Sequence, residues 1–436
     1  MSDPVAQSDP SRAWRHAAQL LTRWLEGAER ADFLLETLPA ELNRVERARV
    51  QALLWGTLRH LGRIEAHLRT LTSHPPRPAV WATLLLAGFE LIEEGADGHA
   101  ARVGHHAVEQ VKRAAHPREA AFTNAVVRRL GEALAAESPP AADAPIADWA
   151  RYYSHPLWLV ERWADRWGRE AALAVLEWDQ QPGEVQVRWR PGAEGDPAAW
   201  SWLHPVPEAP GYFRAEAGHW PEVAAWIAAG AVHVQDAATR HALDLLDPRA
   251  GESVLDLCAA PGGKSLAMAD RMQTGQLVAL DRPGRRLVRL RENLARVPAG
   301  VRARAVGGDL LRQGGRALAV AGAPATYDAV LLDAPCSNTG VMRHRVDVKW
   351  RLEPEEFRRQ ALQQLAMLQA AAERVGPGGR LVYSTCSIDP EENEQVAEAF
   401  VRRSRGAWRE VARCVVRPGA GLAQDGAAAF RFERAS

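Results

Sequence analysis

The chain has 436 residues, too many for one ordinary hydrophobic core, so two or three domains are expected. Hydrophobic residues make up 47% and charged residues 25%, as in globular proteins, and no apolar run approaches the ~20 residues that cross a bilayer. The formal net charge is zero, so the overall balance neither supports nor excludes nucleic acid as a partner.

The cysteines are few and lie in the second half of the chain. There are four, at Cys258, Cys336, Cys386 and Cys414. The first residues lack the apolar core of a signal peptide. A disulfide scaffold is therefore not expected, and a protein of the reducing cytoplasm fits this composition best.

Residues 1–135 are expected to form an all-helical domain. Apolar residues recur at every third or fourth position in several segments, which is the spacing of one helix face. These segments are residues 50–71, 80–91, 103–114 and 122–130. The Pro- and Ala-rich stretch at 137–145 then has the composition of a linker.

Positive charge gathers in two parts of this helical region. Residues 44–69 contain six arginines against two glutamates, and residues 112–129 contain five basic residues against one glutamate. Such segregation suits a surface that contacts phosphates. Ordinary solvated helix faces explain the charges about as well. The candidate RNA contacts here are Arg47, Arg59, Lys112 and Arg113.

Residues 149–232 are expected to form a small α+β domain. Spaced apolar residues between 157 and 173 indicate helices, whereas the alternation over 185–189 indicates a strand. Four prolines between positions 205 and 221 predict loops. The residues of this segment assign no chemistry to it.

Residues 233–436 are expected to form a doubly wound α/β domain, because strands and helices alternate from about position 250 onward. We expect a helix over 353–375. The strands are expected at 253–257, 275–281, 301–306, 327–333 and 379–386. Open sheets of this kind bind ligands at the carboxyl ends of their strands.

Acidic residues and a glycine turn lie at these strand ends. The turn at Gly262-Gly263 would let the backbone approach a ligand and begin a helix. Asp281 ends the second strand, 19 residues later, near where an acid holds ribose hydroxyls in such folds. Asp309 and Asp333 follow the next two strands. Together they would repel a pyrophosphate but tolerate a cationic nucleoside such as S-adenosylmethionine, although each aspartate alone is more often a cap or turn residue.

Two cysteines also follow buried strands. Cys336 precedes a turn and should face the mouth of a pocket, and Cys386 precedes residues 389–392, which resemble a helix start. A helix start lowers a thiol's pKa and makes it a better nucleophile. A buried structural cysteine is the default at any one position. Metal binding fits poorly, because no C-x-x-C pair or suitably spaced histidine is present.

A thiolate, a nearby acid and a methyl-cation donor are what methylation of a pyrimidine at carbon 5 requires. That carbon is too electron-poor to attack a sulfonium by itself. Addition of a thiolate at carbon 6 makes the ring an enamine, and an acid at the ring nitrogen promotes the addition. Loss of the carbon-5 proton then expels the thiol, and a second cysteine can assist this release.

The motifs DLCAAPGGK, LLDAPCSNTG and YSTCSIDPEEN together resemble those of the RNA 5-methylcytosine methyltransferases. Residues 48–68, 106–113 and 122–130 are similar to the NusB-like domain of the bacterial Fmu/Sun (RsmB-type) branch, and residues 154–168 resemble its linker domain. Residues 234–238 look like that family's lead-in to the cofactor strand. The resemblance covers nearly the whole chain.

The resemblance implies a 16S ribosomal RNA (cytosine-C5)-methyltransferase that uses S-adenosylmethionine. It implies a monomer that acts on free or early-assembly RNA, with no metal and no membrane partner. Cys386 carries over as the nucleophile, Cys336 as an aid to product release, Asp333 as the ring-activating acid and Lys264 as a pocket residue. The cofactor contacts that carry over are Cys258, Ala259, Ala260, Pro261, Gly262, Gly263, Lys264, Asp281, Asp309 and Asp333.

The chain also departs from the family's pattern. Arg345-Val346-Asp347 stands where the family often reads Pro-Asp, shortly before Lys349, and Ala427-Ala428 replaces aromatic residues. Only three of the 54 basic residues are lysines, so Lys264 and Lys349 are either held by chemistry or present by coincidence. We expect Lys349 to contact RNA.

Three rival functions remain open. The same chemistry could act on transfer RNA or on another ribosomal site. An RNA-binding factor with an inactive enzyme domain is a second rival, against which the retained Cys386 and Asp333 argue. A DNA cytosine methyltransferase would use the thiol of Cys336 and carry Glu-Asn-Val, whereas Glu392-Asn393 is followed here by Glu394.

Overall fold

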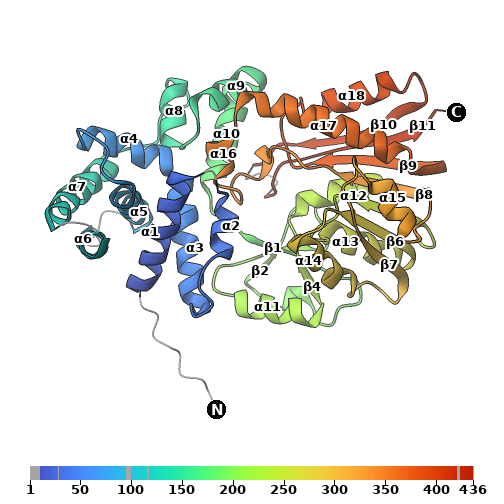
Figure 1. Ribbon diagram of the computed structural model, residues 1–436, viewed down its shortest axis with the longest axis horizontal. Helices are drawn as coiled ribbons and strands as arrows, with labels where there is room; N and C mark the ends of the chain where they lie inside the picture. Colours follow the sequence, from blue (N-terminus) through green and yellow to red (C-terminus); the bar gives the residue numbers. More distant parts are fainter. Residues whose placement is uncertain (1–9, 28, 95–99, 115–116, 420–422, 436) are drawn as a thin grey trace, which may run out of the picture. The chain divides into compact units, whose positions relative to one another are not determined.

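The computed structural model describes residues 10–27, 29–94, 100–114, 117–419 and 423–435. The chain folds into two compact units (Figure 1). Unit 1 contains Met1–Pro182 and Met342–Arg351, and unit 2 contains Gly183–Val341 and Leu352–Ser436. The segment 149–232, which we expected to form one small domain, is thus divided between the units at Pro182.

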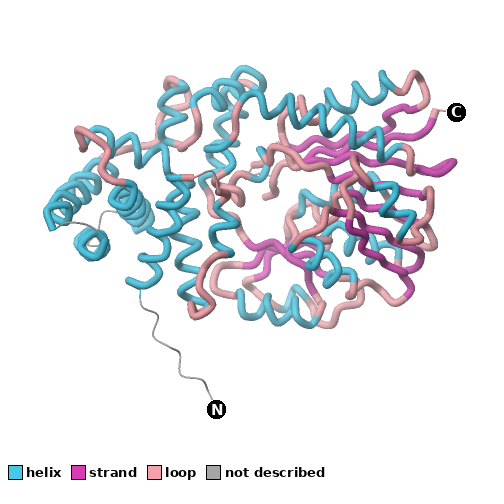
Figure 2. The backbone as a smooth tube through the Cα atoms, viewed as in Figure 1, coloured by secondary structure: helices cyan, strands magenta, loops and turns pink. Residues whose placement is uncertain are grey.

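Unit 1 is helical, and its described residues contain no strand (Figure 2). Buried residues such as Leu53, Leu84 and Leu130 form its core. The helices are α1 (Pro10–Glu26), α2 (Ala31–Glu36), α3 (Arg44–Arg59), α4 (Leu61–Leu71), α5 (Pro78–Glu94), α6 (Ala100–Ala114), α7 (Pro117–Ala135), α8 (Ile146–Tyr152), α9 (Leu157–Trp167), α10 (Arg169–Gln180) and α16 (Val348–Arg351). The helical N-terminal domain is thereby confirmed.

The expected helix face over residues 50–71 is made by two helices. Helix α3 begins with a capping box, in which Asn43 and Glu46 each accept a hydrogen bond from the other's backbone N–H. It ends at His60, whose dihedral angles of φ −102° and ψ 11° are not helical. The spacing of apolar residues is the same before and after His60, so the periodicity alone does not show that one helix ends there and another begins.

The segment Met342–Arg351 follows the loop that contains Pro335 and Cys336, and it belongs to unit 1. Arg59 Nη2 donates to the Arg343 carbonyl at 2.9 Å, and Lys349 Nζ donates to the Arg59 carbonyl at 3.0 Å. Trp350 Nε1 donates to the Leu58 carbonyl at 2.8 Å. The end of α3 is thus held by three side-chain-to-backbone hydrogen bonds with this segment.

Unit 2 contains a small antiparallel sheet with the strand order β2-β3-β1-β4. Its strands are β1 (Val185–Trp189), β2 (Leu203–Pro205), β3 (Tyr212–Ala215) and β4 (Val232–Val234), and α11 (Trp220–Ala229) packs on one face. Residues 185, 187 and 189 of β1 face this helix, which confirms the strand that the alternation predicted.

The larger sheet of unit 2 has seven strands in the order β10-β11-β9-β8-β5-β6-β7. Five strands are parallel, and β11 joins β9 in the antiparallel sense. The strands are β5 (Ser253–Leu257), β6 (Thr274–Asp281), β7 (Gly300–Gly307), β8 (Tyr327–Asp333), β9 (Val375–Thr385), β10 (Trp408–Val416) and β11 (Ala427–Arg434). The five expected strands are confirmed, and the expected doubly wound sheet has an added antiparallel edge.

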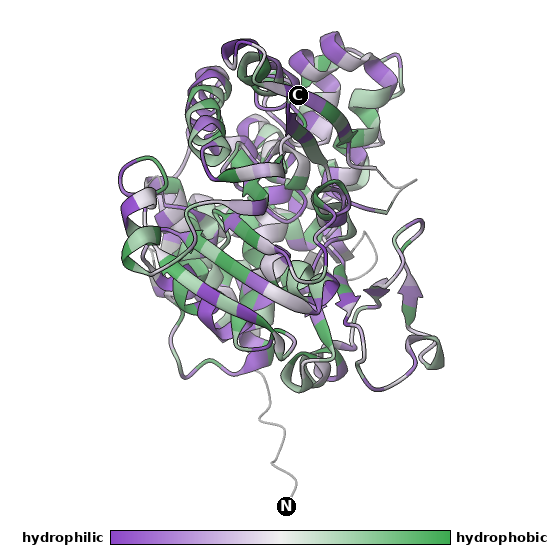
Figure 3. Ribbon diagram, turned by 90° about the vertical axis from the view of Figure 1, so that its right-hand side faces the viewer, coloured by the Kyte–Doolittle hydropathy of each residue, from purple (hydrophilic) through white to green (hydrophobic). Residues whose placement is uncertain are grey.

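Helices cover both faces of this sheet. One face packs against α12 (Arg240–Leu246), α13 (Gly263–Met272) and α14 (Arg285–Leu294). The other face packs against α15 (Gly314–Val320), α17 (Pro354–Ala372) and α18 (Glu394–Arg403). Because both faces are buried, the strands are near-continuous apolar runs, and Figure 3 shows hydrophobic stretches along them. No helix in the described part of the chain is long and apolar enough to cross a membrane.

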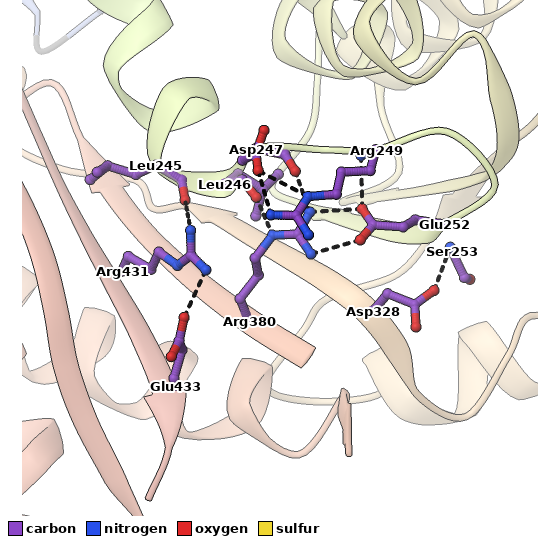
Figure 4. Close-up of polar contacts among 10 residues, drawn as sticks. All are labelled: Leu245, Leu246, Asp247, Arg249, Glu252, Ser253, Asp328, Arg380, Arg431 and Glu433. Carbon is purple, nitrogen blue, oxygen red and sulfur yellow. Dashed lines mark hydrogen bonds and ion pairs between the residues drawn. The ribbon is translucent and has the colours of Figure 1, made fainter. Parts of the chain in front are cut away.

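The amino-terminal end of the sheet is fixed by Arg380 (Figure 4). Its guanidinium pairs with the Glu252 carboxylate at 2.7 and 2.8 Å and donates to the carbonyls of Leu246 and Asp247. Only 7% of Arg380 is exposed, and burial of the charge requires these partners. This cluster joins β9 to the loop before β5, at the end of the sheet opposite the cysteines.

We predict that Glu252→Ala lowers the free energy of unfolding of unit 2 by about 3 kcal/mol, because it leaves the buried Arg380 guanidinium without its carboxylate. Chemical denaturation followed by circular dichroism measures this. Arg249→Ala is the matched control, since its ion pair with Asp247 lies in solvent and should matter much less. Equal losses in the two variants would contradict the prediction.

Candidate active site

The glycine turn after β5 has the geometry that the sequence predicted. Cys258 has φ +62° and Gly262 has φ +106°, and α13 begins at Gly263. A Cβ atom on Gly262 would lie 2.9 Å from Leu290 Cδ1. Glycine is therefore needed at position 262 both for its backbone conformation and for its close approach to α14.

Asp281 and Asp309 lie beside this turn. Asp281 Oδ2 accepts a hydrogen bond from the Ala260 N–H at 2.7 Å, so the end of β6 holds the turn in place. Asp309 pairs with Arg282 at 3.0 Å and accepts from the backbone N–H groups of residues 311 and 312. Both aspartates therefore have the structural partners that the cap-and-turn alternative predicted.

The residues at these strand ends also fit S-adenosylmethionine. Cys258 to Gly263 form an open turn with left-handed backbone at two positions, and carboxylates follow β6, β7 and β8. Inside this group Asp256 is fully buried, and burial raises its pKa to about 7. Such a carboxylate-rich edge suits a ligand that combines a nucleoside with a positive sulfonium, and it disfavours a pyrophosphate.

Asp333 is held between two donors at the end of β8. Lys264 Nζ lies 2.8 Å from Asp333 Oδ2, and Ser384 Oγ donates to Asp333 Oδ1 at 2.9 Å. Burial alone would lower the pKa of Lys264, but the charge and hydrogen bond of Asp333 raise it overall, so the lysine is cationic. The carboxyl group that we expected to activate the ring is thus fixed in position.

Cys336 and Cys386 lie next to each other. Their Sγ atoms are 3.3 Å apart and both thiols are free. Parallel pairing causes this, because Asp333 of β8 stands opposite Ser384 of β9 and each cysteine follows within three residues. The hydrogen bond with Cys386, together with burial, raises the pKa of Cys336 well above its ordinary value.

Only one of these cysteines faces a cavity. Cys386 lines a small pocket of about 60 Å³ together with Lys264 and Asp333. Cys336 is 9% exposed and is not among the lining residues, so the expectation that it faces the pocket mouth is wrong. The remaining lining residues are Asp236, Ala238, Thr239, Ala242, Val341, Ser384, Thr385, Asp425, Gly426, Ala427 and Ala428.

The helix after Cys386 begins later than we expected. Residues 389–392 form a turn, and α18 begins at Glu394. A nearby helix start therefore does not act on the Cys386 thiol as proposed from the sequence. Asn338 lies closer, with Oδ1 3.4 Å from Cys386 Sγ, and its Nδ2 donates to the Cys336 carbonyl at 2.8 Å.

The third cysteine of this edge, Cys258, is not placed to react as a nucleophile. Burial and the neighbouring carboxylates of Asp281, Asp333 and Asp256 raise the pKa of its thiol. Its backbone adopts a positive φ in the turn after β5, where the resemblance implies a cofactor contact.

The candidate RNA contacts fall into two groups. Lys112 and Arg113 are exposed, and Lys112 pairs with Glu109 at 2.8 Å. Arg47 donates to the carbonyls of Leu38, Pro39 and Leu42. Lys349 and Arg59 are only 2% and 6% exposed and bind backbone carbonyls within unit 1. Their burial contradicts the expectation that these two side chains contact phosphates.

Sequence reasoning missed three residues that shape the site. Ser384 holds Asp333, Asn338 contacts Cys386, and Glu392 binds both cysteine loops. A period-two argument could have found Ser384, since it lies two residues before Cys386 at the end of the same strand. Glu392 and Asn338 have no such signal, because their partners come together only when the sheet forms.

Comparison with known structures agrees with the fold. The crystal structure of PH0851 has a TM-score of 0.76 at 20% identity and covers 98% of this chain and 99% of that one. A methyltransferase homolog protein from Pyrococcus horikoshii has a TM-score of 0.55 at 22% identity, over 67% of this chain and all of that one. The likeness shows the fold: a Rossmann-like α/β unit in a chain that also carries a helical domain.

Sequence comparison identifies the family. Residues 243–420 match the family model described as 16S rRNA methyltransferase RsmB/F, and residues 11–132 match the NusB family. Ribosomal RNA small subunit methyltransferase B of Klebsiella pneumoniae is 31% identical over 407 residues, 90% of each chain. A Bacillus subtilis protein named "Probable ribosomal RNA small subunit methyltransferase B" is 31% identical over 387 residues, 83% of this chain and 81% of that protein. The chain belongs to the ribosomal RNA small subunit methyltransferase B family, and its cofactor is S-adenosylmethionine.

The burial of Lys349 generates a prediction about stability. Burial lowers the pKa of Lys349 to about 7 from an ordinary 10.5, against the raising effect of Asp179. Between these values the unfolded chain binds more protons, so the free energy of unfolding should rise as the pH increases from about 7 to 10. This group can contribute at most about 1.4 kcal/mol per pH unit.

We predict that Lys349→Met removes this contribution, so that the difference in unfolding free energy between wild type and variant changes steadily over that pH range. Urea denaturation at several pH values measures it. A constant difference between the two proteins would show that Lys349 stays charged when folded.

Proposed function

We propose that this protein transfers a methyl group from S-adenosylmethionine to carbon 5 of a cytosine in 16S ribosomal RNA, through a covalent bond between Cys386 and carbon 6. The supporting observation is the pocket in which the Cys386 thiol, the Asp333 carboxyl group and Lys264 lie together, with Cys336 directly behind. The family and the names of its relatives support ribosomal RNA as the substrate.

In the first step the sulfur of Cys386 adds to carbon 6 of the cytosine. The S–C6 bond forms as the Cys386 thiol gives up its proton, which the Asp333 carboxylate takes up and passes to ring nitrogen 3. The electron pair of the C5=C6 bond moves to C4–C5, and that of C4=N3 moves to the nitrogen that receives the proton. Ser384 and Lys264 hold the Asp333 side chain, and Lys264 offsets negative charge near the ring. Carbon 5 becomes nucleophilic.

The turn from Cys258 to Gly263, with Asp281, Asp309 and Asp333, would hold the cofactor beside that carbon. When bound, S-adenosylmethionine supplies an electrophilic methyl group, carried on a positively charged sulfur, to carbon 5 of the activated ring. The acidic side chains around the turn favour the cationic form of the ligand over its neutral product.

Release of the methylated RNA requires the bond between Cys386 and carbon 6 to break. A base removes the proton from carbon 5, its electron pair restores the C5=C6 bond, and the S–C6 pair returns to Cys386. Cys336 assists this step from 3.3 Å away.

Lys112 and Arg113 are the predicted phosphate contacts that remain exposed. We propose that the domain 1–135 binds RNA through them, and that the protein works as a cytoplasmic monomer on free or early-assembly RNA. Methylation of defined ribosomal and transfer RNA transcripts, followed by bisulfite mapping, separates these substrates. Methylation of transfer RNA alone would overturn the ribosomal assignment.

We predict that Cys386→Ala lowers methyl transfer by at least about a hundredfold, because no other thiol lines the pocket to replace it. Binding of S-adenosylmethionine, followed by calorimetry, should stay near the wild-type value. Methyl transfer at the wild-type rate would refute the role of Cys386.

We predict that Cys336→Ala slows release and traps a covalent protein–RNA adduct. A denaturing gel with labelled RNA and cofactor measures the adduct, and the double variant Cys336→Ala/Cys386→Ala is its control. If the single variant forms no slowly migrating band, or if the double variant forms the same band, the assignment of release to Cys336 fails.

A further inference from the structure

A carboxylate with no cationic partner is buried behind the two cysteines. Glu392 has no exposed surface, and within the described residues no Lys, Arg or His nitrogen lies within 4.0 Å of its carboxylate. Burying a charge in this way costs free energy of folding, and an uncharged side chain of similar size at this position would avoid that cost. A role in the site accounts for the charge.

Three donors surround this carboxylate. Oε2 accepts from the Ser337 backbone N–H and from Gln364 Nε2, each at 2.9 Å, and Oε1 accepts from Ser387 Oγ at 3.0 Å. Burial raises the pKa of Glu392 overall, and the three donors act against this rise. An arrangement made only of donors suits the ionised carboxylate, which is purely an acceptor.

These donors come from both cysteine loops. Ser337 directly follows Cys336, and Ser387 directly follows Cys386. The two serine hydroxyls are also 3.2 Å apart, and Gln364 donates to the carbonyl of Pro335 at 2.9 Å. Glu392 therefore binds the residues that follow both cysteines. These hydrogen bonds fix the distance between the two cysteine loops.

The surroundings of the two thiols differ in charge. Cys336 contacts Cys386 and lies in the electrostatic range of Glu392 and of the buried Tyr383 hydroxyl. Cys386 lies in the electrostatic range of the Lys264 ammonium. The hydrogen bond between Cys336 and Cys386, burial and the Glu392 charge all raise the pKa of Cys336. Cys336 therefore keeps its proton more strongly than an ordinary thiol does.

We propose that Glu392 is a positioning residue that separates the roles of the two cysteines: it clamps both loops and keeps Cys336 as an S–H donor aimed at Cys386 Sγ. This inference rests on the proposed function. In release, water takes the carbon-5 proton, the C5=C6 bond re-forms, and the S–C6 electron pair goes to Cys386 Sγ. The Cys336 S–H stabilises this departing thiolate by hydrogen bonding, and no oxidation or reduction occurs.

Glu392→Gln tests this role because it removes the charge and keeps the shape. Adduct is formed in a single turnover with target RNA, and its breakdown is followed by denaturing gel at several pH values. We expect breakdown to slow by about tenfold or more. We also expect the loss of rate at high pH to begin at lower pH than in wild type, because removal of a negative charge lets Cys336 ionise sooner. Glu392→Asp keeps the charge and should keep the wild-type pH dependence.

A double-mutant cycle with Cys336→Ala separates this role from a purely structural one. If Glu392 acts through Cys336, Glu392→Gln should not slow breakdown further in the Cys336→Ala background. Glu252→Gln, which alters a partly buried carboxylate at the opposite end of the sheet, is the control for loss of stability. An equal slowing in both backgrounds, or an unchanged pH dependence, would overturn the inference. An active Cys386→Ala variant would instead refute the proposed function.

Discussion

The parallel pairing of β8 with β9 is the constraint on which the site depends. Its register places Asp333 opposite Ser384, so the acid, its hydroxyl partner and the two cysteines emerge at one edge of the sheet. Cys336 and Cys386 are 50 residues apart in sequence, yet their sulfur atoms are 3.3 Å apart. A shift of this register by one residue would turn the side chains of one strand to the opposite face and separate the groups.

Charge then distinguishes groups that are chemically alike. Lys264 lies beside Asp333 in the pocket. The Glu392 carboxylate, which has no cationic partner among the residues that the structure describes, lies behind Cys336. Both charges are partly or fully removed from water, where their influence on neighbouring groups is stronger than at a surface. Two identical thiols can therefore carry out different steps without any difference in their own chemistry.

Much of this site could be predicted from the sequence because its parts lie at the ends of strands. Apolar runs that end in Asp281, Asp333 or Cys386 predicted which residues would share an edge, and the glycine pair predicted the cofactor turn. The strands β10 and β11, which extend the sheet beyond β9, were missed. β10 has one exposed face, so it shows the weaker alternating pattern.

Surface charge was harder to predict, because counting residues along a helix does not show which side chains are buried. We expected Arg59 and Lys349 to lie on an RNA-binding surface, but both are buried inside unit 1. Arg59 donates to the carbonyl of Arg343, and Lys349 donates to the carbonyl of Arg59. Their partners lie 284 and 290 residues away in sequence. The role of Glu392 was hidden for the same reason, since its two serine partners meet only in the folded protein.

The central claim is that Cys386 forms a bond to carbon 6 of a cytosine. The most direct measurement uses 16S ribosomal RNA transcribed with 5-fluorocytidine, in which fluorine at carbon 5 blocks the elimination that releases the enzyme. After reaction with the wild-type protein and S-adenosylmethionine, digestion and mass spectrometry identify the modified peptide. The account predicts a methylated fluorocytidine attached to the peptide that contains Cys386. Attachment at Cys336, or no attachment while methyl transfer to unsubstituted RNA proceeds, would contradict it.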